Sequence, residues 1–449
     1  MNSRNGTQLN NAIVVFTREP LPGLTKTRLM SRYTSEQCAD LHKCFISDIA
    51  ETVAKVNADV IVAYTGGEPV FLSTVFRNAK YHEQIEGSLG DRMLDAISYA
   101  LSLGYKKAIL IGTDTPELRT DTLNDSFARL DISDVVIGPT EDGGYYLIGM
   151  KSLCGAAFEI EQYGNSTVLD NTIRSIENAG LSVVLTDSNS DIDEPHDVQR
   201  YIDRMRIDKC LQNSYTGRYL GANARVSVII PVFNEEAVIE DMLAQLRIID
   251  GEAEILIVDG GSTDKTLEHI GNEFTVLHSK KARAAQMNLG AKSANGDILF
   301  FLHCDCRLPE NAIEDIRHCM TDHYYGCFGV KFESGNFFMW TNRLISNHRA
   351  WRRGLPFGDQ GIFIDRDLFF EMGMFPEIPV MEDYEFGRRM KRHGYMPGKT
   401  EKRIVTSDRR YGKRTIGILK TEFMMWNLRR KYRQGVNIDD ISNVYRDIR

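Results

Sequence analysis

The stretch VSVIIPVFNEEAV, residues 226–238, starts with a short run of mostly apolar residues and then turns polar at two adjacent glutamates. An apolar run of this length, bounded by a proline and a polar turn, is typical of a buried strand. A second run, EILIVDGGSTD at 254–264, also ends in an acid, Asp259, which paired glycines follow. Because parallel sheets bind ligands beyond the carboxyl ends of their strands, the acids after both runs are candidate ligand-binding groups.

The same pattern extends outward from this stretch along the chain. Short β-branched runs alternate with longer amphipathic stretches, which predicts an α/β fold with mainly parallel sheets covered by helices. Strands are expected at 12–17, 59–65, 107–113 and 134–139 in the first half, and at 226–230, 254–259, 275–279 and 297–303 in the second. The series occurs twice, so we predict two tandem Rossmann-like domains.

The domain boundaries follow from a change in composition. Residues 211–224 are polar, contain glycine and show no clear periodicity, so we assign them to a linker between domains at 1–210 and 225–449. A length of 449 residues agrees with two domains, since it exceeds what one ordinary hydrophobic core supports. Neither first strand is followed by the glycine fingerprint of a dinucleotide-binding fold.

Composition bounds the class of protein. The chain is 42% hydrophobic and 26% charged, as in soluble globular proteins, and its longest apolar runs are far too short to cross a bilayer. The polar start MNSRNGTQLNN lacks the pattern of a secretory signal, so we expect a cytoplasmic protein. The eight cysteines have no framework spacing and are expected as reduced thiols. We expect no nucleic-acid partner.

A basic segment lies near the carboxyl end. Residues 402–433 hold eleven Lys and Arg side chains against only Asp408 and Glu422. Such a segment suits an anionic partner, either a phosphate-bearing substrate or an acidic membrane face, and a solvated helix face fits equally well. Ile416, Leu419, Phe423 and Trp426 share one helical face within it. This amphipathic helix either lies peripherally on the inner membrane face or packs on the domain, which is the commoner outcome.

Four further motifs follow the first two strands of the second half. They read KKARAAQMNLGA at 280–291, LHCDCRLP at 302–309, FGDQGIF at 357–363 and MEDYEF at 381–386. Together with PVFNEE and VDGGSTD, they resemble a family 2 glycosyltransferase with the GT-A fold of nucleotide-diphosphosugar transferases. The resemblance covers nearly all of residues 226–412. It is most marked to a subgroup associated with radical-SAM and selenium-domain proteins and with arsenosugar biosynthesis.

The resemblance implies transfer of a sugar from a nucleotide-diphosphate donor, UDP-linked in this family, to an acceptor. The implied donor-binding residues are Pro231, Asn234, Glu235, Asp259, Arg283, Asp359 and Gln360. Asp264, in contrast, is expected to cap the helix that follows it. By resemblance, Asp383 is the base of an inverting transfer and Glu382 is its catalytic neighbour. The alternative is a pair of acids stabilised at a helix N-terminus.

A metal site is expected after the fourth strand of this half. The family's D-x-D appears here as His303-x-Asp305, so the resemblance assigns a divalent cation to Asp305. A hard cation on a carboxylate stabilises the departing diphosphate, and Mg2+ or Mn2+ fits an oxygen-rich site. His303 as a ligand would favour Mn2+, although a strand-end histidine is more often structural. Cys304 and Cys306 stand where the subgroup has Ala and Thr; they point to opposite faces of a strand, so small buried thiols are expected rather than zinc ligands.

The first half carries its own set of strand-end residues. TREPLPGLTKTRL at 17–29 brings Lys26 and Arg28 into a loop that can wrap phosphates, although it is not a Walker sequence. Acids follow in LIGTDTPEL (Asp114), EDGGYYLIG (Asp142) and SNSDIDEPHDV, which supplies Asp191 and Asp193. The order resembles, over about residues 12–205, a small bacterial family with a nucleotide-diphosphosugar transferase fold, related in layout to molybdenum-cofactor and 2-phospholactate guanylyltransferases.

This second resemblance implies nucleotidyl transfer from a nucleoside triphosphate. Asp114 and Asp193 would hold the metal, Lys26 and Arg28 would grip the phosphates, and Asp142 would contact the nucleotide. Asp193 could instead cap the helix that begins near Pro195. We therefore predict a bifunctional transferase whose first domain makes or binds an activated nucleotide and whose second domain transfers a sugar. A first domain that is a second glycosyltransferase, or a non-catalytic nucleotide-binding module, remains the alternative.

Overall fold

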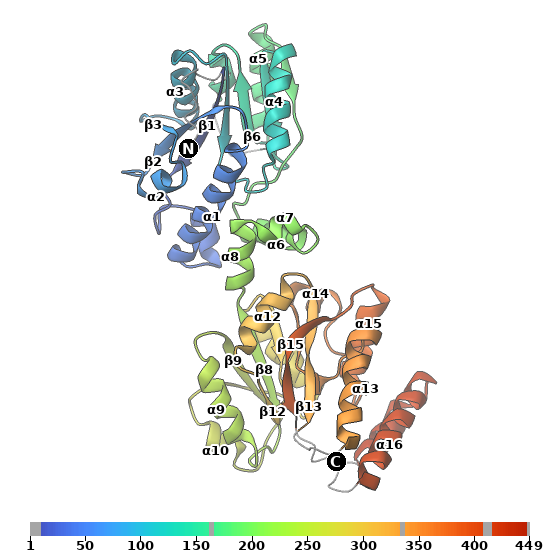
Figure 1. Ribbon diagram of the computed structural model, residues 1–449. Helices are drawn as coiled ribbons and strands as arrows, with labels where there is room; N and C mark the ends of the chain where they lie inside the picture. Colours follow the sequence, from blue (N-terminus) through green and yellow to red (C-terminus); the bar gives the residue numbers. More distant parts are fainter. Residues whose placement is uncertain (1–9, 161–165, 333–336, 407–414, 447–449) are drawn as a thin grey trace. The chain divides into compact units, whose positions relative to one another are not determined.

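The chain folds into two compact units, described by a computed structural model over residues 10–160, 166–332, 337–406 and 415–446. The first unit spans Met1–Leu220 and the second spans Gly221–Arg449 (Figure 1). The segment predicted as a linker is helical, with α7 at Lys209–Asn213 and α8 at Tyr215–Asn223. Asp48 fixes the start of α8, because its carboxylate accepts the backbone N–H groups of Tyr215 and Thr216 at 2.7 and 3.0 Å.

The first unit is built on a seven-stranded sheet with the order β3-β2-β1-β4-β6-β5-β7. Its strands are β1 (Asn11–Arg18), β2 (Asp59–Thr65), β3 (Lys80–Glu83), β4 (Lys107–Gly112), β5 (Val135–Pro139), β6 (Tyr145–Met150) and β7 (Val183–Leu185). All neighbours are parallel except β6, which runs antiparallel to both β4 and β5.

Helices cover both faces of this sheet. They are α1 (Ser35–Val53), α2 (Val70–Val75), α3 (Leu89–Ser102), α4 (Thr120–Ile132), α5 (Val168–Asn178) and α6 (Pro195–Met205), with short 3-10 turns η1 (Thr27–Ser31) and η2 (Gly155–Phe158). Alternate residues of β1 serve opposite layers: Ala12 and Val14 pack towards α3 and α5, whereas Ile13 and Val15 pack towards α1 and α4. This two-residue period places successive side chains on opposite faces of the sheet.

The second unit has an eight-stranded sheet with the order β10-β9-β8-β11-β14-β13-β15-β12. Its strands are β8 (Val226–Val232), β9 (Glu254–Asp259), β10 (Thr275–His278), β11 (Ile298–Phe301), β12 (Cys306–Arg307), β13 (Tyr325–Phe332), β14 (Ile362–Asp365) and β15 (Gly398–Thr406). As β6 does in the first sheet, β14 lies antiparallel beside the fourth strand, β11. The two units therefore repeat one topology.

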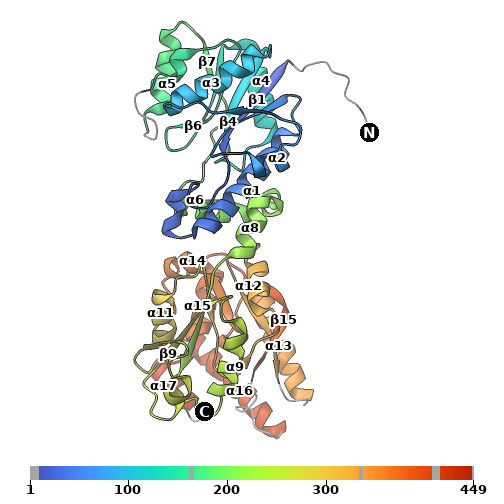
Figure 2. The same cartoon turned by 90° about the vertical axis from the view of Figure 1, so that its left-hand side faces the viewer.

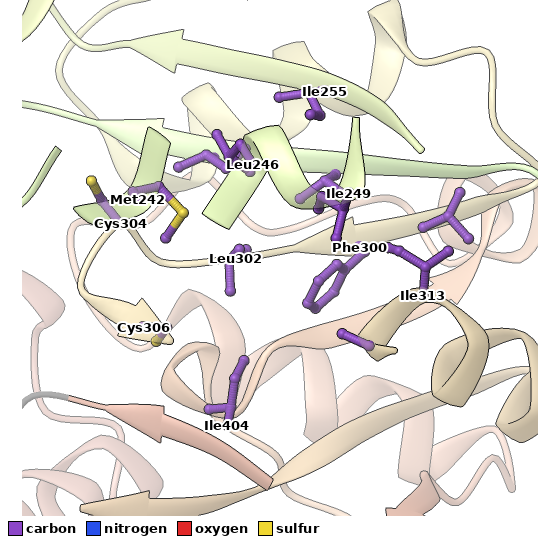
Figure 3. Close-up of a cluster of buried hydrophobic side chains, with 14 of the residues drawn as sticks. Met242, Leu246, Ile249, Ile255, Phe300, Leu302, Cys304, Cys306, Ile313 and Ile404 are labelled. Carbon is purple, nitrogen blue, oxygen red and sulfur yellow. The ribbon is translucent and has the colours of Figure 1, made fainter. Parts of the chain in front are cut away.

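The helices of the second unit are α9 (Ile239–Ile249), α10 (Thr266–Ile270), α11 (Arg283–Ser293), α12 (Ala312–Met320), α13 (Phe337–Arg353), α14 (Arg366–Glu371), α15 (Glu382–Arg392), α16 (Thr415–Arg433) and α17 (Ile438–Arg446), with η3 at Gly358–Gln360. One core layer joins the sheet to α9 and α12 around Phe300 (Figure 3). The other joins it to α11, α14 and α15, which lie together in the view of Figure 2.

These observations confirm the expected α/β fold with two tandem domains, and every one of the eight predicted strands is present. The sheets are mixed rather than purely parallel, because antiparallel strands follow the parallel core of each. Cys304 and Cys306 are buried at 5% and 1% exposure in the core cluster, as small thiols. Among the described residues, no helix has the length and apolar character that crossing a membrane requires.

Candidate functional sites

The second unit has a cavity of about 710 Å³ near the ends of β8 and β11. Seven of the predicted site residues line it, namely Pro231, Glu235, Arg283, His303, Asp359, Glu382 and Asp383. These residues are up to 152 positions apart in the sequence, and the sheet topology brings them together at the edge where β8 and β11 end. This is the edge at which open α/β sheets bind ligands. The remaining predicted residues of this half, Asn234, Asp259, Asp305 and Gln360, are not among the lining residues.

Two of these residues hold the strand-end loops together. Asn234 has a positive φ of 53° and accepts the backbone N–H of Thr263 at 2.8 Å, while its own N–H donates to Ser262. Asp259 is 1% exposed and accepts the backbone N–H groups of Gly261 and Ser262. Asp264 was predicted to cap the next helix; its carboxylate accepts the N–H of Thr266 at 3.0 Å, but the N-cap position of α10 is Lys265. The polar residues of these motifs therefore stabilise the loops at the ends of β8 and β9.

The predicted base, Asp383, is fixed within the cavity lining. Its Oδ2 accepts the backbone N–H of Gly358 at 2.8 Å, and its Oδ1 accepts that of Tyr384 at 2.6 Å. Asp383 is the second residue of α15, so it also stabilises the N-terminus of its own helix. Gly358 in turn lies against the imidazole of His303, where a methyl group on its Cα would approach His303 Cε1 to 2.7 Å. Asp383, Gly358 and His303 thus form one packed unit.

Asp305 lies next to this unit but is not part of the cavity lining. It precedes β12 and is half-buried. The Cys306 thiol connects it to the η3 turn, since Cys306 Sγ lies 4.0 Å from Asp305 Oδ1 and 3.8 Å from the carbonyl oxygen of Asp359. Among the described residues, no group of three or more His, Cys, Asp or Glu side chains is arranged to hold a metal ion.

The residues beside the cavity nevertheless fit a divalent cation of the kind predicted. Mg2+ and similar ions in phosphate-transfer sites are commonly held by one or two carboxylates and completed by water and by the phosphates of the substrate. Asp305 supplies one carboxylate two residues after His303, which lines the cavity. A three-ligand protein cluster is not required for this kind of site.

Arg283 and Glu382 form an ion pair in the cavity lining. Arg283, the first residue of α11, places its guanidinium 3.6 Å from the carboxylate of Glu382, which is 5% exposed. Gln360 is fully buried, and its Oε1 accepts the backbone N–H of Phe357 at 3.2 Å. Glu382 and Asp359 therefore line the cavity, whereas Gln360 contacts only protein groups in the described structure.

Three cationic side chains of the cavity had no role in the sequence prediction. Lys281 lies 3.8 Å from the ring centroid of Phe233, Arg349 of α13 lies 3.6 Å from that of Phe357, and Arg429 of α16 lies 5.6 Å from the same ring. All three line the cavity with Arg283. Only the excess of Lys and Arg in the last helices signalled such groups in advance, and it did not single out Arg429. The four cations offer charged donors for a diphosphate, beside four acids of the same lining.

The basic helix packs on the second unit. Leu428 of α16 is 2% exposed, joins Tyr384 and Ile441 in one apolar cluster, and is followed by Tyr432, which donates to Glu385 at 3.2 Å. Phe423 and Trp426 were predicted to share one apolar face of this helix. Packing of that face on the domain is wrong for these two residues, because they are 67% and 45% exposed. Residues 407–414 lie outside the described part of the chain, and so do the side chains of Ile416 and Leu419.

The first unit has a separate cavity of about 470 Å³ at the ends of β1 and β4. Lys26, Arg28, Asp114, Asp191 and Asp193 line it, as the strand-end pattern predicts. Burial and the carboxylates of Asp142, Asp193 and Asp114 raise the pKa of Asp191 to about 6.

Of the acids expected at this site, Asp142 lies outside the cavity lining, and Asp193 does not have the capping role given as its alternative. The carboxylate of Asp142 accepts the N–H of Gly144 at 3.1 Å, so it shapes the β5–β6 turn instead of lining the cavity. Helix α6 is capped by Glu194, which leaves Asp193 free of that alternative role.

The predicted metal position in this unit is occupied by a lysine. Lys26 Nζ lies 2.7 Å from Asp114 Oδ1 and 2.9 Å from Asp193 Oδ1, with the lysine side chain only 5% exposed. Burial opposes the charge of Lys26, but the two carboxylates outweigh this effect and raise its pKa. Asp114 keeps about half of its side chain exposed, and the ammonium of Lys26 holds the pKa of that carboxyl group below its usual value against the cost of desolvation. An ammonium bound to one oxygen of each carboxylate places a positive charge where a divalent cation would lie, so the residues as arranged do not fit the predicted metal.

His42 is buried beside this centre and is expected to stay neutral well below pH 6. Its Nδ1 is 2.6 Å from Thr25 Oγ1 and its Nε2 is 3.2 Å from Thr113 Oγ1. Burial lowers the pKa of His42 to about 4, with Lys26 adding to the effect against Asp114. Because an unfolded histidine titrates near pH 6.5, the free energy of unfolding of this unit should fall as the pH drops from about 6.5 to about 4.

Nuclear magnetic resonance of the histidine-labelled full chain tests this prediction, with His42→Gln used to assign the resonance. The His42 signal should not shift between pH 8 and about pH 5.5. A midpoint near 6.5 would contradict the burial argument.

Comparisons with known proteins divide the chain in the same way. Residues 227–377 match the family model described as Glycosyl transferase family 2, and residues 48–165 match the model described as Uncharacterized protein conserved in bacteria (DUF2064). Each half of the chain is thus similar to a different family.

Relatives and solved structures of related kinds also match. The PGL/p-HBAD biosynthesis glycosyltransferase of Mycobacterium bovis is 29% identical over 215 residues, which are 44% of this chain and 82% of the relative. The undecaprenyl-phosphate 4-deoxy-4-formamido-L-arabinose transferase of Yersinia pestis is 24% identical over 155 residues, 31% of this chain and 47% of that protein.

Among solved structures, a candidate nucleotide-diphospho-sugar transferase from Desulfovibrio desulfuricans is 28% identical, with a TM-score of 0.45 and coverage of 48% of this chain and 96% of its own. A mannosyltransferase from Pyrobaculum calidifontis, solved with GDP-Man and Mn2+, is 22% identical, with a TM-score of 0.34 and coverage of 46% and 61%. The family match and the curated relatives support sugar transfer. They support a similarity to family 2 glycosyl transferases, but they do not support the arsenosugar subgroup.

Proposed function

We propose that the second unit transfers a sugar, with inversion, from a nucleoside-diphosphate donor to the hydroxyl of an acceptor. The observation that carries the proposal is the composition of the 710 Å³ cavity, which combines four cations with Asp383 and His303 at the ends of β8 and β11. The donor would be UDP-linked, as the family resemblance implies. The diphosphate of the donor would lie among the cationic side chains. The anomeric carbon of its sugar would then face Asp383.

The side chains divide the chemistry between them. Asp383 accepts the proton of the acceptor hydroxyl as that oxygen attacks the anomeric carbon, and the N–H of Gly358 holds its carboxylate in place. Glu382 positions Arg283 towards the donor through their ion pair. A Mn2+ or Mg2+ ion held by Asp305, with His303, would neutralise charge on the departing diphosphate. Glu235 and Asp359 line the cavity and can accept hydrogen bonds from the sugar.

For the first unit we propose a nucleotide- or phosphate-binding role, with nucleotidyl transfer from a nucleoside triphosphate as its reaction. The arginines that line the cavity at the ends of β1 and β4 support this role. The acceptor of the second unit is proposed to be an arsenosugar-type or lipid-linked hydroxyl compound. For a lipid-linked acceptor, the exposed pair Phe423 and Trp426, beside Arg430, would give peripheral contact with an acidic membrane face.

The test is a screen of the full chain against UDP- and GDP-sugars, with Mn2+ and with a chelator, followed by mass spectrometry. We expect release of nucleoside diphosphate from one donor class, at least 10-fold faster with Mn2+ than with the chelator. A parallel arm with nucleoside triphosphates and sugar 1-phosphates measures pyrophosphate release by the first unit, and anionic vesicles test the contact of α16. If no nucleotide sugar is bound or turned over in any arm, the assignment of the second unit fails.

A further inference from the structure

The first unit contains a lysine whose hydrogen-bonding capacity is completely used within the protein. A lysine ammonium has three donors, and Lys26 Nζ has three acceptors within 2.9 Å: Asp114 Oδ1, Asp193 Oδ1 and the carbonyl oxygen of Ile192. The side chain is 5% exposed and its ammonium lies 5.4 Å from the ring centroid of Phe45. Lys26 therefore has no donor left for a phosphate, and it already supplies positive charge to the two aspartates.

The backbone of Lys26 supports a built-in role. Its φ of 48° and ψ of 42° lie in the left-handed region, which side-chain-bearing residues rarely adopt. Such conformations persist where the surrounding structure holds a side chain in place, and they concentrate at functional sites. Here the strained turn directs the lysine inward to the space between the ends of β4 and the loop before α6.

Other cations of the same cavity do have capacity for a ligand. Arg92, in the first turns of α3, has a buried Nε with no hydrogen-bond partner, and its guanidinium lies 5.7 Å from the ring centroid of Phe16. Arg18, at the end of β1, donates to the carbonyl oxygen of Leu24. Within the described ranges, neither arginine forms an ion pair with an acid, and both line the 470 Å³ cavity.

A second polar group of the cavity also lacks a partner in the described structure. Gln84 donates from Nε2 to the carbonyl oxygens of Thr17 and Ala63, each at 2.9 Å, which fixes its orientation at the ends of β1 and β2. Its Oε1 is buried without a hydrogen bond and belongs to a side chain that lines the cavity. Buried polar groups are normally satisfied, so an unpaired guanidinium nitrogen and an unpaired amide oxygen in one cavity indicate a bound polar ligand.

We infer that the first unit binds a phosphate-bearing anion without a divalent cation, through Arg92 and Arg18, with Lys26 as the permanent counter-cation of Asp114 and Asp193. The inference refines the nucleotide- or phosphate-binding role proposed above for this unit and is independent of sugar transfer by the second. It replaces the expected metal and the expected phosphate contact of Lys26 by groups that the sequence motifs did not single out. Gln84 Oε1 is the acceptor for a donor group on the non-phosphate part of the ligand.

Hydrogen exchange of the full chain with inorganic pyrophosphate in the presence of EDTA tests the inference. Peptides that cover residues 12–28 and 84–95 should gain protection without any metal. Arg92→Gln should lower the apparent affinity for pyrophosphate, measured from this protection, about 10-fold or more, because a charge-assisted hydrogen bond is lost. Arg77→Gln is the matched control: Arg77 is an exposed arginine of the same unit outside the cavity, and its replacement should leave the affinity unchanged.

The same samples give a metal readout by electron paramagnetic resonance of Mn2+. Asp114→Asn should not change the number of Mn2+ ions bound by the full chain, whereas Lys26→Met, which exposes the two aspartates to each other, should add one. Protection that requires Mn2+, or a Mn2+ equivalent lost in Asp114→Asn, would overturn the metal-free centre. Absence of protection in both conditions would overturn the anion site itself. The wild-type arms decide the question even if Lys26→Met fails to fold, and neither outcome depends on sugar transfer.

Discussion

Asp383→Asn is expected to lower kcat for sugar transfer by about 10²- to 10⁴-fold, the usual contribution of a general base. Asparagine keeps the size of the side chain, and its amide oxygen can still accept the N–H of Gly358, which Asp383 Oδ2 now accepts at 2.8 Å. The substitution removes the ability to take up a proton and the acceptor for the N–H of Tyr384, which Asp383 Oδ1 now accepts at 2.6 Å. The KM for the donor should therefore stay within a few-fold of the wild-type value, and steady-state kinetics with the donor found in the screen measures both quantities.

The control separates a catalytic role from a helix-capping one. Asp367 is the second residue of α14, as Asp383 is of α15, and it is exposed and outside the cavity. Asp367→Asn removes the same favourable interaction with a helix N-terminus and should leave kcat unchanged. If Asp383→Asn transfers sugar at close to the wild-type rate, Asp383 is only a helix-terminal acid and the proposed base is elsewhere.

The strands that the sequence predicted are those that form from short local patterns. β1, β2, β8 and β9 are apolar runs followed by a polar turn, and burial of both faces of a parallel sheet leaves little alternative for such runs. β6 was missed although the turn TEDGG between two apolar runs is a signal for a hairpin. The long separation between β13 and β14 leaves no local signal, because their pairing joins Cys327 to Ile362 across α13.

The residues of the candidate sites were also predictable only in part. Acids at strand ends could be located from sequence, because strand direction and sheet topology decide where they gather. Their individual partners could not, because a partner depends on residues far away in the chain. Lys26 was expected to hold phosphates, yet its partners Asp114 and Asp193 are 88 and 167 positions away. Asp259 was expected to face the donor, yet its carboxylate also accepts the N–H groups of the loop after it.

The cavity of the second unit shows most clearly which site residues a sequence pattern does not identify. Arg349 and Arg429 come from α13 and α16, which follow the motif-bearing strands and have no strand-end position. Their cationic side chains reach the cavity because each packs near the ring of Phe357. A sequence pattern identifies such helices as amphipathic, but it does not indicate which of their several arginines faces the site.

Gly358→Ala is expected to lower sugar transfer by about 10²-fold, the cost of displacing reacting groups by about 1 Å. A Cβ at this position would overlap the imidazole of His303, with Cε1 at 2.7 Å, and would lie 3.6 Å from Asp383 Oδ2. The backbone of η3 or the imidazole must therefore shift, and Asp383 would move with the N–H of Gly358 that it accepts. Initial rates of nucleoside-diphosphate release with saturating donor and acceptor measure the loss.

A double-mutant cycle with His303→Ala decides whether steric overlap with the imidazole is the cause. When the imidazole is removed, the overlap disappears, so Gly358→Ala should cost less than about 3-fold in the His303→Ala background. Gly155→Ala is the matched control, because a Cβ at Gly155 meets no atom within 4 Å. An equal loss in both backgrounds would show that η3 tolerates no side chain for a reason unrelated to His303. The packed unit of Asp383, Gly358 and His303 would then not be what holds the base in position.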